Sequence, residues 1–249
     1  NTNQNIILCI LYISIAVYIR QYYFIFFLFY FLKILQILKP KKIFNLIFLI
    51  ITIFIPFIIY YYYFFKVNIV TESLAENTFG INIFNNILIF SSLYFFYTIP
   101  FYISNFTEIK KNIFKNLNKL LIIFFVFGGI YFYYPLALDT LGGGIFMKIS
   151  MILHKKIIFL ASSFFGIFLI LLNLNKGNFV VYLCLIFAFP TTIIYQKYYD
   201  PLLIMTILTL TKGGILNQIL NFNRINLFYI YSYFIFFLII SNLYYSLNL

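Results

Sequence analysis

Long runs without charged residues set the strongest limit on what this chain can fold into. Residues 43–65, 81–103 and 225–247 each contain no charged side chain, and short polar segments separate such runs. About 20 consecutive apolar residues are enough for one helix to cross a bilayer. Only 9% of the residues are charged, whereas soluble domains carry about 25%. The sequence therefore predicts an all-α fold, a polytopic transmembrane helix bundle of about nine helices.

Basic and proline-containing segments mark where these spans end. Pro40 among three lysines closes the second run, and Pro56 predicts a kink because its ring clashes with the Thr52 carbonyl. The chain starts at Asn1, and its first apolar run has no basic segment ahead of it, so this run does not resemble a signal peptide. We therefore expect further residues before Asn1. We interpret residues 1–249 as a single integral membrane domain and the C-terminal part of a longer chain. The predicted spans are residues 6–19, 22–38, 43–65, 81–103, 120–134, 157–172, 179–194, about 201 to beyond 212, and 225–247.

The distribution of basic residues predicts an orientation. Alternating the loops places 11 of the 17 basic residues on one side and 6 on the other. The positive-inside rule makes the richer side cytoplasmic, so residues 110–119 lie inside and residues 139–148 outside. The net charge of +12 then meets lipid headgroups, so we expect membrane lipid as a partner and no nucleic acid. The location is multi-pass, in a bacterial inner membrane.

Several kinds of chemistry have no signature in this sequence. There is no Walker loop, no G-x-S-x-G motif and no Ser-His-Asp set. Cys9 and Cys184 lie far apart inside apolar runs, which indicates buried free thiols. His154 beside two lysines is more readily a headgroup contact than a catalyst. We therefore expect no metal and no cofactor.

The outer side holds four of the five acids, and three polar stretches there are candidate sites. The first is residues 195–201, where Gln196 and Lys197 would bind phosphate or sugar hydroxyls and Tyr198 and Tyr199 would stack on a sugar ring. The structural alternative is that Asp200 caps a helix beginning at Pro201 and that the tyrosines form an interfacial belt.

The second stretch contains a run of glycines. Three glycines in succession permit positive φ and close approach to an anion, or they form a flexible loop. Its candidate residues are Asp139, Gly142, Gly143, Gly144 and Lys148.

The third stretch is Arg20-Gln21. Arg20 would clamp a phosphate, or its side chain would extend to the headgroups. We expect the three stretches to converge on one outward-facing cavity.

Two of these stretches carry a family resemblance. Arg20-Gln21 after one span, and the tyrosine-rich stretch 195–201 before a late one, resemble the polytopic GT-C glycosyltransferases, in particular the dolichyl-phosphate-glucose alpha-glucosyltransferase family. The resemblance implies sugar transfer from a polyprenyl-phosphate-linked donor to an acceptor on the outer face. Arg20 or Lys197 would hold the phosphate. Such enzymes place a catalytic acid in the first outer loop. Here the first acid is Glu72, so the catalytic base is unassigned and that loop would precede Asn1.

A lipid-linked sugar flippase, a transporter or a polysaccharide-assembly protein is the main alternative. Transporters typically show inverted repeats and charges near the middle of the membrane. This sequence shows no internal repeat, and its charges lie at the ends of the runs. A membrane subunit without chemistry of its own is a third interpretation. The pattern favours the glycosyltransferase.

Overall fold

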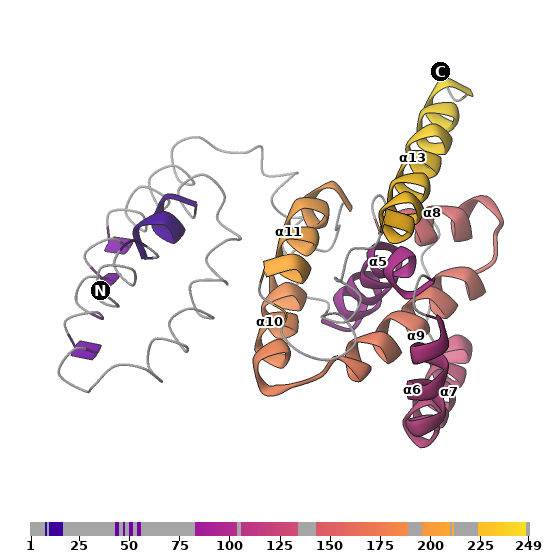
Figure 1. Cartoon of the computed structure of the whole chain (residues 1–249), viewed down its shortest axis with the longest axis horizontal. Coiled ribbons are helices and arrows are strands. Elements are labelled where there is room, and N and C mark those ends of the chain that lie inside the picture. Colours follow the sequence, from indigo (N-terminus) through magenta and orange to yellow (C-terminus); the bar gives the residue numbers. More distant parts are fainter. Residues whose placement is uncertain are drawn as a thin grey trace. The chain divides into compact units, whose positions relative to one another are not determined.

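In the described part of the chain every regular element is a helix, and no strand occurs (Figure 1). The all-α prediction is thus confirmed for these residues. The chain divides into two compact units, Asn1–Asn86 with Val180–Ile193, and Ile87–Phe179 with Ile194–Leu249. The computed structural model describes residues 8, 10–16, 43–44, 47, 50–51, 54–55, 83–103, 106–133, 143–188, 196–209, 211 and 224–247.

The predicted apolar runs and the observed helices agree best where polar residues end the run sharply. Residues 157–172 were predicted as a span and form a helix with the same bounds. The helices beginning near residues 81 and 225 differ from prediction by two residues or fewer. The bounded helices are α5 Ile83–Ile103, α6 Phe106–Lys115, α7 Leu117–Tyr133, α8 Ile145–Ile152, α9 Ile157–Leu172, α10 Lys176–Phe187, α11 Gln196–Thr209 and α13 Arg224–Leu247.

Two segments predicted as loops contain helices. Residues 104–119 contain α6 and the start of α7, and residues 135–156 contain α8. In α6 the polar residues occupy one side and the apolar residues the other, which is the pattern of a surface helix. A rule that reads every basic segment as a loop misses such a helix because it counts charge and ignores spacing.

Helix α5 is the centre of the second unit. Phe90 and Tyr94 are fully buried, and so are Ser91 and Ser92. The Ser92 hydroxyl donates to the Ile89 carbonyl at 2.9 Å, so its polar group is satisfied within the helix itself. A helix that is apolar on all sides is enclosed by other helices or by lipid.

Helix α9 approaches α5 very closely. The Ser163 hydroxyl donates to the Leu88 carbonyl of α5 at 2.9 Å. A Cβ atom on Gly166 would lie 1.9 Å from the Ser91 carbonyl oxygen. Small residues at a crossing let two backbones touch, which is the usual way in which helices pack inside membranes.

By length and composition, α5 is the one helix of the described residues able to cross a membrane. The shorter apolar helices are Leu117–Tyr133, Ile157–Leu172, Lys176–Phe187 and Leu227–Ile239. The predicted number of spans therefore stays a prediction. Pro56 and its expected kink lie outside the described residues.

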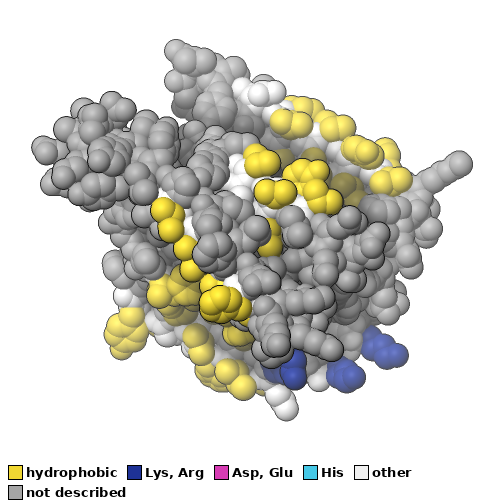
Figure 2. Space-filling model, turned by 90° about the vertical axis from the view of Figure 1, so that its left-hand side faces the viewer, with side chains coloured by type: hydrophobic (Ala, Val, Ile, Leu, Met, Phe, Trp, Pro, Cys, Tyr) yellow, Lys and Arg dark blue, Asp and Glu magenta, His cyan; other side chains and the backbone are white. Residues whose placement is uncertain are grey.

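Large apolar side chains cover two exposed helix faces. Figure 2, viewed from the left-hand side of Figure 1, also shows hydrophobic side chains at the surface, with lysines at the lower edge. Soluble monomers rarely expose continuous apolar patches of more than a few hundred Å². Exposed apolar faces of this kind are typical of surfaces that contact lipid or another protein. The exposed apolar residues on α7 and α13 include Leu121, Ile122, Phe124, Phe125, Phe132, Phe228, Tyr231, Phe236 and Leu238.

Candidate functional site

A hydrogen bond between Tyr97 and Asp200 forms the centre of the candidate site. The Tyr97 hydroxyl of α5 donates to Oδ1 of Asp200 in α11, across 103 positions of sequence. Tyr97 is buried and Asp200 is half-buried. Asp200 is the one acidic residue whose side chain lies in the described part of the chain. A hydrogen bond to a carboxylate is a strong one, so Tyr97 fixes the direction of this group.

The position of Asp200 corrects the predicted helix cap. Helix α11 begins at Gln196, so Asp200 lies inside the helix and does not cap it. Pro201 is the sixth residue of α11 and so lies beyond the first turn, where missing N–H groups cost nothing. The helix therefore gives up the hydrogen bond that residue 201 would make to the Lys197 carbonyl.

The aromatic surroundings correct the predicted role of Tyr199. Its ring is fully buried and packs against Phe90, with 6.3 Å between ring centroids. No ring face of Tyr199 is left for a sugar to stack on, so the expected stacking role does not fit this residue. Tyr97 packs beside Phe234 of α13 at 6.0 Å. The Tyr97–Asp200 pair thus lies against an aromatic core.

A proline in α5 determines how α13 contacts this core. Pro100 lacks the N–H that would bond to the Phe96 carbonyl four residues earlier. The Tyr233 hydroxyl of α13 donates to that carbonyl at 3.0 Å instead. The Phe96 ring packs edge-on against Phe237 at 4.7 Å. Because Tyr97 follows Phe96, this contact also positions the Tyr97 side of the site.

A second polar cluster joins the end of α5 to the turn between α9 and α10. Nδ2 of Asn173 donates to the Tyr102 hydroxyl at 2.6 Å and to the Leu169 carbonyl at 2.9 Å. Nδ2 of Asn178 donates to the Asn173 carbonyl at 2.8 Å. Oδ1 of Asn173 is buried and has no hydrogen-bond partner among the described residues. The two ends joined here are both predicted to be cytoplasmic, but Tyr97, five residues before Tyr102, bonds to Asp200, which was predicted to lie outside, so the orientation stays a prediction.

The glycine stretch has a structural role at the start of α8. Gly143 and Gly144 are buried and adopt φ of 79° and 85°, a region that side chains disfavour. A Cβ atom on Gly143 would lie 1.8 Å from the Met147 sulfur. Gly143 therefore leaves room for Met147, and the expected open approach to a ligand does not fit this glycine. Lys148 is exposed.

The remaining predicted site residues are only partly described. Gln196, Lys197 and Tyr198 lie in the first turn of α11, where the structure describes the backbone alone. The convergence of the three stretches on one cavity stays a prediction. Residues Arg20, Gln21, Asp139 and Gly142 lie outside the described part of the chain.

Tyr97 is the functional candidate that the sequence did not single out. It is one of 24 tyrosines, and its neighbours in the sequence do not distinguish it. Asp200 was the one clue in the sequence, because a carboxylate between apolar runs needs a hydrogen-bond donor. Many hydroxyls could have supplied that donor, and only the packing of α5 against α11 selects Tyr97.

The described residues contain no group of three His, Cys, Asp or Glu side chains able to hold a metal ion. Cys184 is buried and is not part of a disulfide, as predicted. No protein-family model, curated protein or solved structure matches this chain. The site is therefore interpreted from its own chemistry.

Proposed function

We propose that this chain is a multi-pass integral membrane protein. The length and composition of α5 and the small-residue crossing of α5 and α9 support this location. The exposed apolar faces of α7 and α13 support it further, because lipid would cover them. Exposing these apolar side chains to water costs free energy, whereas contact with lipid does not.

Within that class we propose a membrane glycosyltransferase that uses a polyprenyl-phosphate-linked sugar. The choice of reaction rests on the family resemblance of the Arg20-Gln21 and 195–201 stretches. The observation that carries the proposal is the Tyr97–Asp200 hydrogen bond. An ionisable side chain among apolar helices is a functional candidate by default. We assign Asp200 as the catalytic base, which the family resemblance had left unassigned.

The reaction would use Asp200 as the general base. The acceptor hydroxyl loses its proton to the Asp200 carboxylate while its oxygen attacks the anomeric carbon of the sugar. The bond from that carbon to the phosphate oxygen breaks, and the polyprenyl phosphate leaves with the electron pair. The Tyr97 hydroxyl keeps the carboxylate oriented throughout. Lys197 lies three residues before Asp200, a spacing that puts both positions on one helix face, where a cation would offset the phosphate charge.

The test is release of polyprenyl phosphate from a defined donor. The full chain in proteoliposomes is supplied with polyprenyl-phosphate glucose or mannose together with a lipid-linked saccharide whose hydroxyls can act as acceptor, and the released polyprenyl phosphate is quantified. We expect release by the parent chain, at least a hundredfold loss in Asp200→Asn and a smaller loss in Tyr97→Phe. Tyr229→Phe, an exposed tyrosine on α13, serves as the matched control. Absence of release by the parent, or full activity in Asp200→Asn, would reject the transferase.

A lipid-linked sugar flippase or transporter is the second candidate, and Asp200 favours it too. The sequence indicated charges at the ends of runs, whereas Asp200 packs against the buried α5. Ionisable groups in such positions mark substrate and proton paths. Movement of a lipid-linked sugar across proteoliposomes without release of polyprenyl phosphate would select this function over transfer.

A further inference from the structure

Helices α6 and α7 are separated by a single residue, Asn116, which lies in a turn. The Asn116 N–H donates to the carbonyls of Asn112 and Ile113, both at 3.1 Å, and the Leu120 N–H donates to the Asn116 carbonyl at 3.2 Å. The turn interrupts the α-helical register, so side chains three or four positions apart share a flank within each helix. Because only one residue lies between the helices, Lys115 at the end of α6 and Lys119 in the first turn of α7 both adjoin this turn.

Exposed lysines lie on both sides of this turn. Lys111, Lys115 and Lys119 follow one another at four-residue spacing, and all three are exposed. Like charges at this spacing repel each other and destabilise a helix. Residues 106–119 contain four lysines against a single glutamate, Glu108. A row of cations of this kind is stabilised when an anion lies along it.

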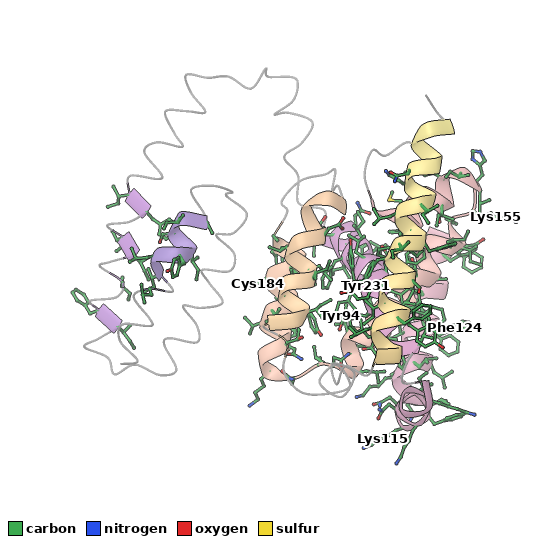
Figure 3. All side chains as sticks on the ribbon, turned by 45° about the horizontal axis from the view of Figure 1, so that its top comes forward. Tyr94, Lys115, Phe124, Lys155, Cys184 and Tyr231 are labelled. Atoms are coloured by element: carbon green, nitrogen blue, oxygen red, sulfur yellow. The ribbon has the colours of Figure 1, made fainter. Side chains whose placement is uncertain are left out.

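The flank of α7 that carries Lys119 becomes apolar immediately beyond it, because residues three and seven positions later lie on the same side of the helix. Ile122 and Val126 continue it with exposed fractions of 64% and 55%. The other flank of α7 is the packed one, where Phe127 meets Phe164 of α9 at 5.7 Å. Figure 3 shows the Lys115 side chain extending away from the helices. Charge followed by exposed aliphatic side chains matches, along one line, a lipid headgroup followed by its acyl chain.

We propose that the α7 flank from Lys119 to Val126, together with Lys111 and Lys115 at the adjoining end of α6, binds an anionic phospholipid. The phosphate lies among the three ammonium groups, whose flexible stems reach toward the headgroup plane. An acyl chain lies along Ile122 and Val126. Charge complementarity selects an anionic lipid over a zwitterionic one, because each lysine near the surface adds to the attraction. The proposal rests on the membrane location proposed above.

The absence of tryptophan from the sequence makes a single-reporter experiment possible. The full-length Ile122→Trp variant is reconstituted in phosphatidylcholine vesicles that contain either brominated phosphatidylglycerol or brominated phosphatidylcholine. Bromine quenches tryptophan fluorescence only at short range. We expect the brominated anionic lipid to quench several-fold more effectively at equal mole fraction. Adding Lys111→Gln, Lys115→Gln and Lys119→Gln should remove this preference.

Two controls make the result specific. Leu238→Trp places the reporter on exposed α13, where both brominated lipids should quench equally. Lys148→Gln with Lys155→Gln removes two exposed lysines elsewhere and should leave the preference at residue 122 unchanged. Equal quenching by both lipids in the parent, or a preference that survives the triple substitution, would overturn the lipid site alone. Absence of quenching at both reporters would reject the membrane location as well.

Discussion

The Tyr233 hydroxyl donates a 3.0 Å hydrogen bond to the Phe96 carbonyl, the group whose helical partner is missing because residue 100 is proline. A helix that contains proline leaves one carbonyl to be satisfied by a neighbour, and in an apolar setting no water replaces it. The link therefore does two things. It satisfies the backbone of α5, and it attaches α13 to α5 one residue before Tyr97.

Tyr233→Phe should lower the free energy of unfolding by about 1–2 kcal/mol, because the Phe96 carbonyl loses its donor. In a Pro100→Ala background the same change should cost clearly less, since an alanine at that position restores the helical N–H. Denaturant titration of the four variants in mixed micelles gives the coupling. Equal costs in the two backgrounds would contradict this account.

Gly166→Ala should destabilise the chain by about 3 kcal/mol or more, because its Cβ atom would lie 1.9 Å from the Ser91 carbonyl oxygen. A backbone atom has little freedom to move aside. Gly129→Ala is the matched control, since nothing lies within 4 Å of its added Cβ atom. That change should be neutral or stabilising by up to about 1 kcal/mol. Similar unfolding midpoints for the two variants would show that α5 and α9 do not meet at Gly166.

Asn173→Ala should loosen the end of α5 from the turn between α9 and α10. The substitution removes the hydrogen bonds to Tyr102 and Leu169, at a cost of about 2 kcal/mol. Amide hydrogen exchange should increase at this turn, and the α5–α9 crossing should keep its protection. Asn118→Ala, at an exposed position on α7, should leave exchange unchanged. Unaltered exchange at the turn in Asn173→Ala would refute a stabilising role for this cluster.

The predicted orientation is open to cysteine labelling after Cys9 and Cys184 are replaced by serine. Asn118→Cys and Lys155→Cys are both at exposed positions. A membrane-impermeant maleimide added outside should label residue 155 and not residue 118, because the basic segment is assigned to the cytoplasm. The reverse pattern would invert the orientation, and labelling of both would place them on one side.

The sequence predicted the bounds of α5, α9 and α13 to within two residues. Residues 157–172 form α9 with the predicted bounds, because Lys155-Lys156 and Asn173 interrupt the run on either side. The prediction from sequence missed α6, because lysines obscure the helical spacing of its apolar residues. It also placed the start of α11 at Pro201, whereas the helix begins five residues earlier. Both errors came from treating charge and proline as signals that end a helix.

Only the tertiary structure decided which polar groups meet. Tyr97 and Asp200 are 103 positions apart, and Tyr233 and Phe96 are 137 apart. A helix apolar on all sides has no polar face to show which neighbour it will contact. The sequence could therefore predict that Asp200 is a costly group among apolar runs. That Tyr97 would be its donor follows from how α5 packs against α11, since backbone contacts at small residues set helix crossings in such bundles.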